Sequence, residues 1–185
     1  MEKYSLFNLS YENLQAILDQ DLKIEKKKLN MRTQQIFSAT YQKGLNDFKN
    51  LTTIPQELRE KLVETFYLNK SKIVETHKSK DGTLKFLVEL SDGNKVECVY
   101  IPEKNRGTIC ISSQVGCSLT CTFCRSGTQK LVKNLDASEI IDQIMLVKEK
   151  LNDWGDQKII SNIVFMGQGE PLINMKNLKI AIKII

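Results

Sequence analysis

The sequence contains no long apolar run, no recognisable secretory signal and only one histidine, His77. No stretch approaches the roughly 20 apolar residues that a membrane-spanning helix requires. Residues 1–5 lack the charged and then apolar layout of a signal peptide. We therefore expect a cytoplasmic protein without a membrane partner, in which thiols remain reduced and free to bind metal. His77 stands between polar residues, where a lone histidine is more often solvated than a ligand.

Composition and charge are those of a soluble globular protein with a modest basic excess. The 185 residues are 41% hydrophobic and 26% charged, with a net charge of +5. Residues 1–80 hold 14 Lys and Arg against 10 Asp and Glu, whereas residues 81–185 hold 13 against 12. The densest basic run is 26–28. This excess is compatible with a phosphate-binding face for RNA, and equally with a solvated helix end.

Apolar spacing in the first third predicts a small helical module over residues 1–70. Helical periodicity follows Ser10, a plausible N-cap, over 10–20. A second helix is expected over about 31–47. A third is expected to start at Pro55, where proline suits a first helical turn.

Shorter, strand-like segments follow in residues 71–104. Strands are expected over 73–74, 84–90 and 95–101, with Asp-Gly turn signals at 81–82 and 92–93. This pattern predicts a β-hairpin or three-stranded meander that links the helical module to the rest of the chain.

Residues 105–185 alternate between strand and helix patterns. A strand over 108–112 is followed by a capping box, Asp136 and Glu139, which begins a helix expected to reach Leu151. A second strand over 159–166 and a helix over 176–185 complete the pattern. Strand and helix in alternation indicate an α/β fold whose parallel sheet is buried on both faces.

Three of the five cysteines, Cys117, Cys121 and Cys124, lie within eight residues in the spacing C-x3-C-x2-C. Structural zinc usually takes four ligands from two separated pairs. Three thiolates in one loop instead suit a cubane iron–sulfur cluster with one iron left open. A zinc module with Cys110 or His77 as fourth ligand is the alternative. A disulfide or inert core cluster is disfavoured by the polar stretch and the missing signal.

The surrounding residues narrow the interpretation. An aromatic residue, Phe123, precedes the third cysteine, and the segments 31–37, 99–102, 110–117 and 165–174 accompany the motif. Together they resemble the RlmN family of radical S-adenosylmethionine (SAM) enzymes, which methylate C2 of adenine in 23S ribosomal RNA and transfer RNA. The resemblance implies a helical accessory domain that holds RNA, a β-hairpin region, and the first βα units of a partial (β/α) barrel.

The resemblance also implies cofactors and site residues. Cys117, Cys121 and Cys124 would hold a 4Fe–4S cluster, reduced by an electron donor, and SAM would bind its open iron. Gly169 and Glu170 match the SAM-binding segment of the family. Glycine permits close backbone approach, and the carboxylate can meet the SAM ammonium. Phe123 either packs against the adenine of SAM or is a core aromatic.

Two further residues gain roles only through the resemblance. Cys110 matches the cysteine that resolves a protein–RNA adduct through a transient disulfide, and Glu97 matches the proposed proton acceptor. From the residues alone, Cys110 reads as a small buried hydrophobe and Glu97 as an outward-facing strand residue. Cys98 alternates to the other face and reads as core.

The chain departs from the family pattern at its C-terminal side. No cysteine follows Cys124 to carry the methyl group, and only two βα units are present where the family has about six. We therefore expect a shortened or split enzyme, with a separate chain as a possible source of the missing half. By itself it should not methylate adenine. A non-catalytic RNA-binding remnant and a zinc-binding RNA-interaction module are the alternative functions.

Overall fold

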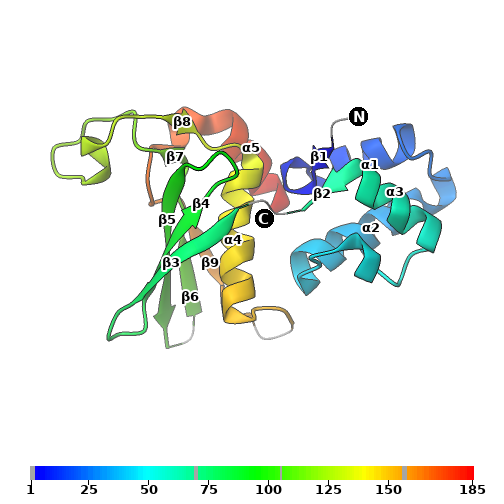
Figure 1. The fold of residues 1–185 in the computed structure, drawn as a ribbon, viewed down its shortest axis with the longest axis horizontal. Helices are drawn as coiled ribbons and strands as arrows, with labels where there is room; N and C mark the ends of the chain where they lie inside the picture. Colours follow the sequence, from blue (N-terminus) through cyan, green and yellow to red (C-terminus); the bar gives the residue numbers. More distant parts are fainter. Residues whose placement is uncertain (1–2, 69–70, 105, 156–157) are drawn as a thin grey trace.

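The computed structural model describes residues 3–68, 71–104, 106–155 and 158–185. A helical module and a five-stranded sheet lie on opposite sides of the long helix α4 (Figure 1). The elements are, in chain order, β1 (Tyr4–Ser5), η1 (Leu6–Asn8), α1 (Tyr11–Gln20), α2 (Lys26–Lys43), η2 (Phe48–Asn50), α3 (Gln56–Thr65), β2 (Phe66–Tyr67), β3 (Lys72–Lys78), β4 (Leu84–Glu89), β5 (Lys95–Glu103), β6 (Arg106–Cys110), β7 (Gln114–Val115), η3 (Ser126–Thr128), β8 (Lys133–Asn134), α4 (Ala137–Leu151), β9 (Asn162–Val164), η4 (Pro171–Asn174) and α5 (Met175–Ile184).

The helical module follows the periodicity of the sequence, but both ends of its second helix lie earlier than expected. Ser10 caps α1 by accepting a hydrogen bond from the Asn13 amide at 3.3 Å, as expected. Helix α2 begins at Lys26, five residues before the expected start, and ends at Lys43, four residues before the expected end. Gly44 caps it in the left-handed conformation. The expected start was wrong because helix propensity, which is high for lysine, extends the helix beyond its apolar positions. The three lysines of 26–28 thus form the first turn of α2.

One continuous sheet contains all five longer strands, in the order β3-β4-β5-β6-β9. Strands β3 to β6 are antiparallel neighbours, and β9 joins β6 in parallel. The strands expected as a linker over 71–104 therefore share their sheet with the βα unit that follows. The expected parallel pairing is confirmed, although β9 is shorter than the predicted strand over 159–166.

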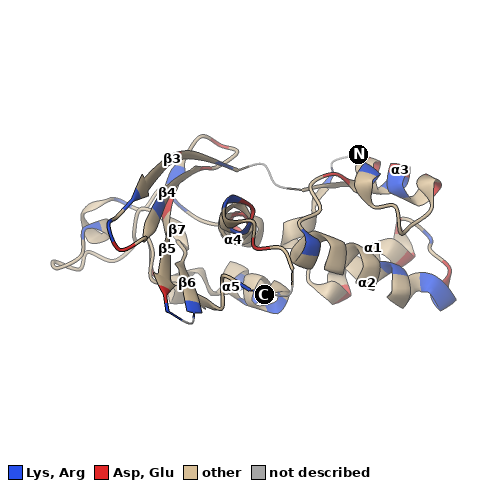
Figure 2. Cartoon of the chain, turned by 90° about the horizontal axis from the view of Figure 1, so that it is seen from below, with Lys and Arg blue, Asp and Glu red and all other residues tan. Residues whose placement is uncertain are grey.

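Only one face of this sheet is covered by helices. Helices α4 and α5 lie between the sheet and the helical module (Figure 2). Along β5, Val96, Cys98 and Tyr100 point into this core, whereas Glu97 and Val99 alternate to the open face. The prediction of a sheet buried on both faces was wrong for the described residues, because α4 and α5 both pack on the same side.

Helix α4 connects the two parts of the molecule. The predicted capping box is present: Asp136 accepts from the Glu139 amide at 2.8 Å, and Glu139 accepts from the Asp136 amide at 3.0 Å. In the first turn the Ser138 amide donates to Asn8 of the helical module at 2.6 Å. At the other end the Lys148 ammonium donates to the Tyr41 carbonyl at 3.2 Å. Among the described residues, no helix has the length and apolar character needed to cross a membrane.

Candidate cluster and cofactor site

The three closely spaced cysteines lie in the long loop that joins β7 to β8. These two short strands pair antiparallel, Val115 with Lys133, and so close the base of the loop. In Figure 1 the loop projects from the end of the sheet, on the side away from the helical module. Cys117, Cys121 and Cys124 are free thiols of intermediate exposure. They are therefore accessible for ligation without unfolding of the core.

Backbone amides donate to the sulfur atoms of Cys117 and Cys124 in this loop. The Leu119 amide donates to Cys117 Sγ at 3.4 Å. Hydrogen bonds from the backbone of Gly127 and then Ser126 lower the pKa of the Cys124 thiol below its usual value. Hydrogen bonds to the charged form stabilise it, and the thiolate is the form that binds metal. The loop thus provides donors of the kind that an iron–sulfur cluster requires.

The described residues hold no preformed site for a single metal ion. Within the part of the chain that the structure describes, no three His, Cys, Asp or Glu side chains are grouped to hold one ion. His77 lies on the edge strand β3, where its Nε2 is 2.9 Å from a carboxylate oxygen of Glu75. A cubane cluster makes a different demand, because each thiolate binds a separate iron. The three free thiols of the loop supply one ligand for each of three irons.

The segment 167–171 lies beside the base of the cysteine loop. Gly169 has a positive φ of 93°, and the Ser113 amide donates to the Gln168 carbonyl at 2.8 Å. Glu170 precedes the short helix η4, and its Oε1 accepts from the Leu172 amide at 3.0 Å. The carboxylate of Glu170 thus caps η4 while the residue remains partly exposed.

Two glutamines that were missed in the sequence connect these segments. Gln114 is fully buried, and its Oε1 accepts from the Glu170 amide at 2.9 Å. Gln168 reaches across to two other elements: its Oε1 accepts from the Glu97 amide at 3.3 Å, and its Nε2 donates to Gln129 at 3.2 Å. None of these three contacts has a sequence signal, because each depends on which group folding brings near the glutamine amide.

Cys110 and Glu97 are on the open face of the sheet. Strand register pairs Val99 with Cys110, so that alternation puts Glu97, Val99 and Cys110 on the same face. Glu97 is engaged there, because its Oε1 lies 3.0 Å from the ammonium of Lys85. Burial raises the pKa of the Cys110 thiol, while a hydrogen bond from the Met166 backbone acts in the opposite direction.

The exposure of Cys98 and of Phe123 tests the interpretations given to them above. Cys98 is 1% exposed, and burial, with a smaller contribution from Cys110, raises its pKa to about 12. The prediction of Cys98 as a core residue is confirmed. Phe123 is 91% exposed, so the interpretation as a core aromatic was wrong. All five cysteines are free, and the structure contains no disulfide between them.

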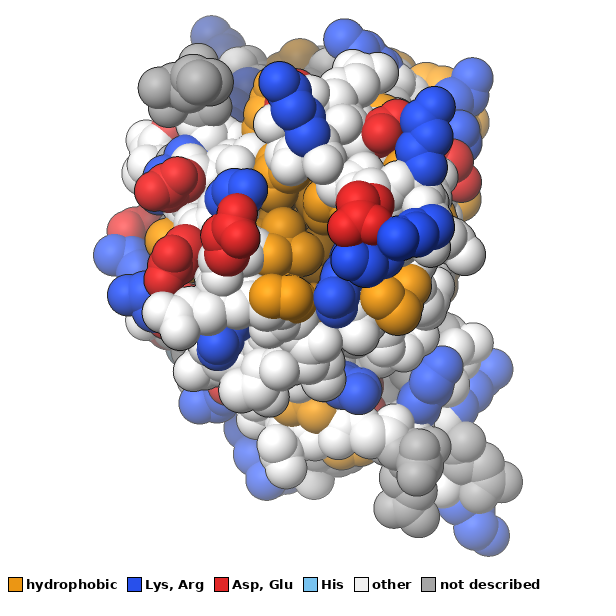
Figure 3. All heavy atoms as spheres, turned by 90° about the vertical axis from the view of Figure 1, so that its right-hand side faces the viewer, with side chains coloured by type: hydrophobic (Ala, Val, Ile, Leu, Met, Phe, Trp, Pro, Cys, Tyr) orange, Lys and Arg blue, Asp and Glu red, His pale blue; other side chains and the backbone are white. Residues whose placement is uncertain are grey.

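The helical module offers no continuous basic surface on the face in Figure 3. Lysine and arginine side chains there alternate with acidic ones around an apolar patch. In α2, Lys27 and Lys28 lie 3.1 and 2.8 Å from the carboxylate of Glu25. These exposed pairs are weak and leave the ammonium groups accessible to solvent.

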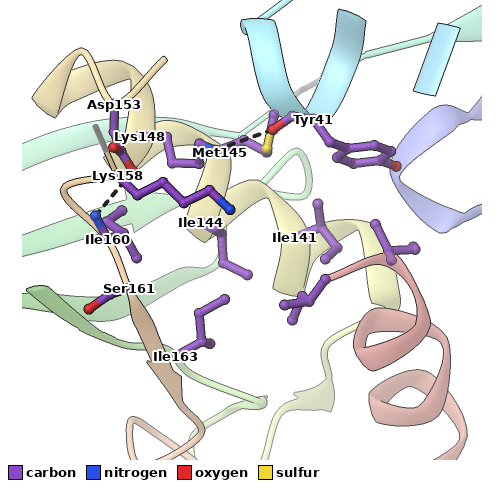
Figure 4. Close-up of a pocket in the computed structure, with 12 residues that line it drawn as sticks. Tyr41, Ile141, Ile144, Met145, Lys148, Asp153, Lys158, Ile160, Ser161 and Ile163 are labelled. Atoms are coloured by element: carbon purple, nitrogen blue, oxygen red, sulfur yellow. Dashed lines mark hydrogen bonds between the residues drawn. The ribbon is translucent and has the colours of Figure 1, made fainter. Parts of the chain in front are cut away.

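A cavity of about 350 Å3 opens between α4, β9 and Tyr41 of the helical module (Figure 4). Its floor is apolar and includes Ile141, Ile144 and Ile163, with Lys148 at its side. None of the site residues predicted from the sequence lines it. The cavity is therefore distinct from the cysteine loop.

Comparison with known proteins finds relatives that match nearly the whole chain. The model of the family described as Ribosomal RNA large subunit methyltransferase N-terminal domain matches residues 4–68. The Dual-specificity RNA methyltransferase RlmN of Jannaschia sp. (strain CCS1) is 46% identical over 188 residues, which cover 97% of this chain and 48% of the relative. That of Parvibaculum lavamentivorans is 48% identical over 85% of this chain and 42% of the relative. The chain belongs to the RlmN family.

A solved structure extends the RlmN comparison to the fold. The crystal structure of a radical SAM methyltransferase from Sphaerobacter thermophilus is 31% identical, with a TM-score of 0.84 over 98% of this chain and 51% of that one. The α/β fold class and the family predicted from the motifs are thus confirmed. The chain spans about half the length of the curated relatives it matches.

Proposed function

We propose that this chain provides the cluster loop and part of the SAM site of a radical SAM methyltransferase. Its substrate would be C2 of adenine in 23S ribosomal RNA and transfer RNA. The observation that carries the proposal is the exposed loop of three free thiols, together with relatives named as RNA methyltransferases and a neighbour described as a radical SAM methyltransferase. The family also implies an electron donor as a partner.

The cofactors in this proposal are a 4Fe–4S cluster and SAM. Cys117, Cys121 and Cys124 would hold the cluster, with amide donation stabilising the thiolate of Cys124. Gly169 would admit SAM close to the backbone, and Glu170 would offer its carboxylate to the ammonium group. When bound, the two cofactors supply radical chemistry that can activate an unreactive C–H bond. The exposed ring of Phe123 is available to cover the adenine of SAM.

Cys110 and Glu97 would act on the open face of the sheet. Cys110 would resolve the covalent adduct, and burial raises the pKa of its thiol. Glu97 would accept a proton, but its carboxylate is paired with Lys85 at 3.0 Å. Because an exposed pair of this kind is weak, Lys85 can move away and free the carboxylate at little cost.

The test is anaerobic reconstitution with iron and sulfide. We expect a brown protein with about four irons per chain, and loss of the cluster when any of Cys117, Cys121 or Cys124 is changed to Ala. Cys110→Ala is the matched control, because it removes a partly buried thiol outside the loop and should leave the iron content unchanged. Stoichiometric zinc without iron–sulfur absorbance would contradict the proposal and favour the zinc module.

A further inference from the structure

Gln114, the first residue of β7, has a completely buried side chain that contacts three separate segments. Its Oε1 accepts from the Glu170 amide at 2.9 Å and from the Ser118 amide at 3.4 Å. Its Nε2 donates to Asn134 Oδ1 at 2.7 Å. Because a buried amide is costly unless both ends are paired, this position requires a donor and an acceptor at once.

A second observation places the backbone of segment 167–171 directly against the same side chain. A Cβ added to Gly169 would lie 2.5 Å from Gln114 Cβ and 2.6 Å from Gln114 Cγ. No residue larger than glycine fits there without moving β7 or segment 167–171. The backbone amide of Gln114 also donates to the backbone carbonyl of Gln168 at 3.2 Å. The side chain and the backbone of Gln114 thus both bind segment 167–171.

We propose that Gln114 is a positioning residue that fixes the cysteine loop relative to Glu170. Ser118 directly follows the first cysteine, and Glu170 follows Gly169, so one side-chain oxygen joins the two segments proposed to bind the cluster and SAM. The inference rests on the proposed function. Its consequence is preorganisation: the two binding segments are held in register before either cofactor arrives.

The first experiment measures hydrogen exchange of the Glu170 amide in the folded, metal-free chain. Gln114→Met keeps the shape but removes the acceptor, and exchange should become about tenfold faster, the upper range for one hydrogen bond. Gln114→Glu keeps an acceptor oxygen and should retain most of the protection, because Asn134 can turn its amide to donate. Unchanged exchange in Gln114→Met would overturn the inference.

The matched control is Gln143→Met. Gln143 is equally buried and bonds the backbone of Ser112, with its Oε1 accepting from the Ser112 amide at 2.8 Å and its Nε2 donating to the Ser112 carbonyl at 3.0 Å. General loosening of the core would accelerate Glu170 exchange in both Met variants. The inference requires acceleration in Gln114→Met alone, and equal acceleration in the two would overturn it. If Gln114→Met fails to fold, Gln114→Asn withdraws the amide by one methylene and carries the same expectation.

The second experiment measures iron content and the Kd for SAM after anaerobic reconstitution. Gln114→Met should take up iron as the unmodified chain does but bind SAM about tenfold more weakly, whereas Gln114→Glu should restore most of the affinity. Equal SAM affinity in Gln114→Met and the unmodified chain would refute the positioning role. Failure of the unmodified chain to bind iron would refute the proposed function instead, and the exchange result would still decide whether Gln114 joins the two segments.

Discussion

Three glycines allow the cost of backbone strain to be separated from the cost of a steric clash. Gly93, in the turn between β4 and β5, has a φ of +83° and nothing within 4 Å of an added Cβ. Gly167 has no such strain, but an added Cβ would lie 2.7 Å from the carbonyl carbon and oxygen of Ile111. Gly169 combines a φ of +93° with a Cβ only 2.5 Å from Gln114. The loss of stability on substitution by alanine should therefore be smallest at Gly93, larger at Gly167 and largest at Gly169.

The magnitudes follow from the two contributions. A non-glycine residue at positive φ costs about 1 to 3 kcal/mol, of which roughly 0.4 to 1 kcal/mol is offset by the reduced entropy of the unfolded chain. Overpacking against atoms that cannot move away adds about 1 to 3 kcal/mol. We expect losses of about 1 kcal/mol for Gly93→Ala, about 2 for Gly167→Ala and about 3 for Gly169→Ala. A methyl group added at Gly169 would meet the Cβ, the Cγ and the backbone nitrogen of Gln114. These atoms are not the flexible end of a side chain and cannot easily move away.

Urea unfolding of the metal-free variants provides the assay. The single tryptophan, Trp154, lies just after α4, and its Nε1 donates to Glu149 of that helix at 2.9 Å, so its fluorescence reports on the core beneath the sheet. The free energy of unfolding is compared at equal m-value, since a changed m-value would indicate a different unfolded state. A loss for Gly169→Ala within about 0.5 kcal/mol of the loss for Gly93→Ala would refute the clash with Gln114.

Two more predictions concern charge. Lys133 holds the pKa of Asp92 at about 2, below its usual 3.8, with Nζ 2.5 Å from Oδ2. This contribution to stability is present above about pH 4 and is lost as pH falls toward 2, so Asp92→Asn should flatten acid unfolding over that range; an unchanged profile would contradict it. For RNA, exchanging Lys26, Lys27 and Lys28 for Gln should lower both the affinity for transfer RNA and the slope of log K against log salt. Unchanged binding would make this turn of α2 a solvated helix end.

Local patterns predicted the helices well because local physics forms them. The cap at Ser10 and the box of Asp136 and Glu139 lie next to apolar residues at helical spacing, and both caps are present in the structure. The cysteine spacing alone similarly indicated the candidate cluster. These features require only residues that are close in sequence, so no tertiary contact had to be known.

Features that depend on pairing between residues far apart in the sequence could not be predicted from local patterns. Nothing in residues 71–104 shows that their strands continue the sheet of β6 and β9. The pairing of Glu97 with Lys85 depends on the register between β5 and β4. Gln114 was missed because its bond to Glu170, and one of its bonds to Ser118, use backbone amides, which every residue except proline has. Its bond to the Asn134 side chain depends on the pairing of β7 with β8.

The register of β5 against β6 decides which cysteine is available for chemistry. Val99 opposite Cys110 leaves Cys110 on the open face and sends Cys98 into the core beside α4. A slip of β6 by one residue would move Cys110 to the buried face and expose Ile109, which is now fully buried. The apolar core therefore disfavours a one-residue slip, because that slip would turn Ile109 to the open face. Since Glu97 shares the face of Val99, the same packing keeps the two residues proposed to act on RNA together.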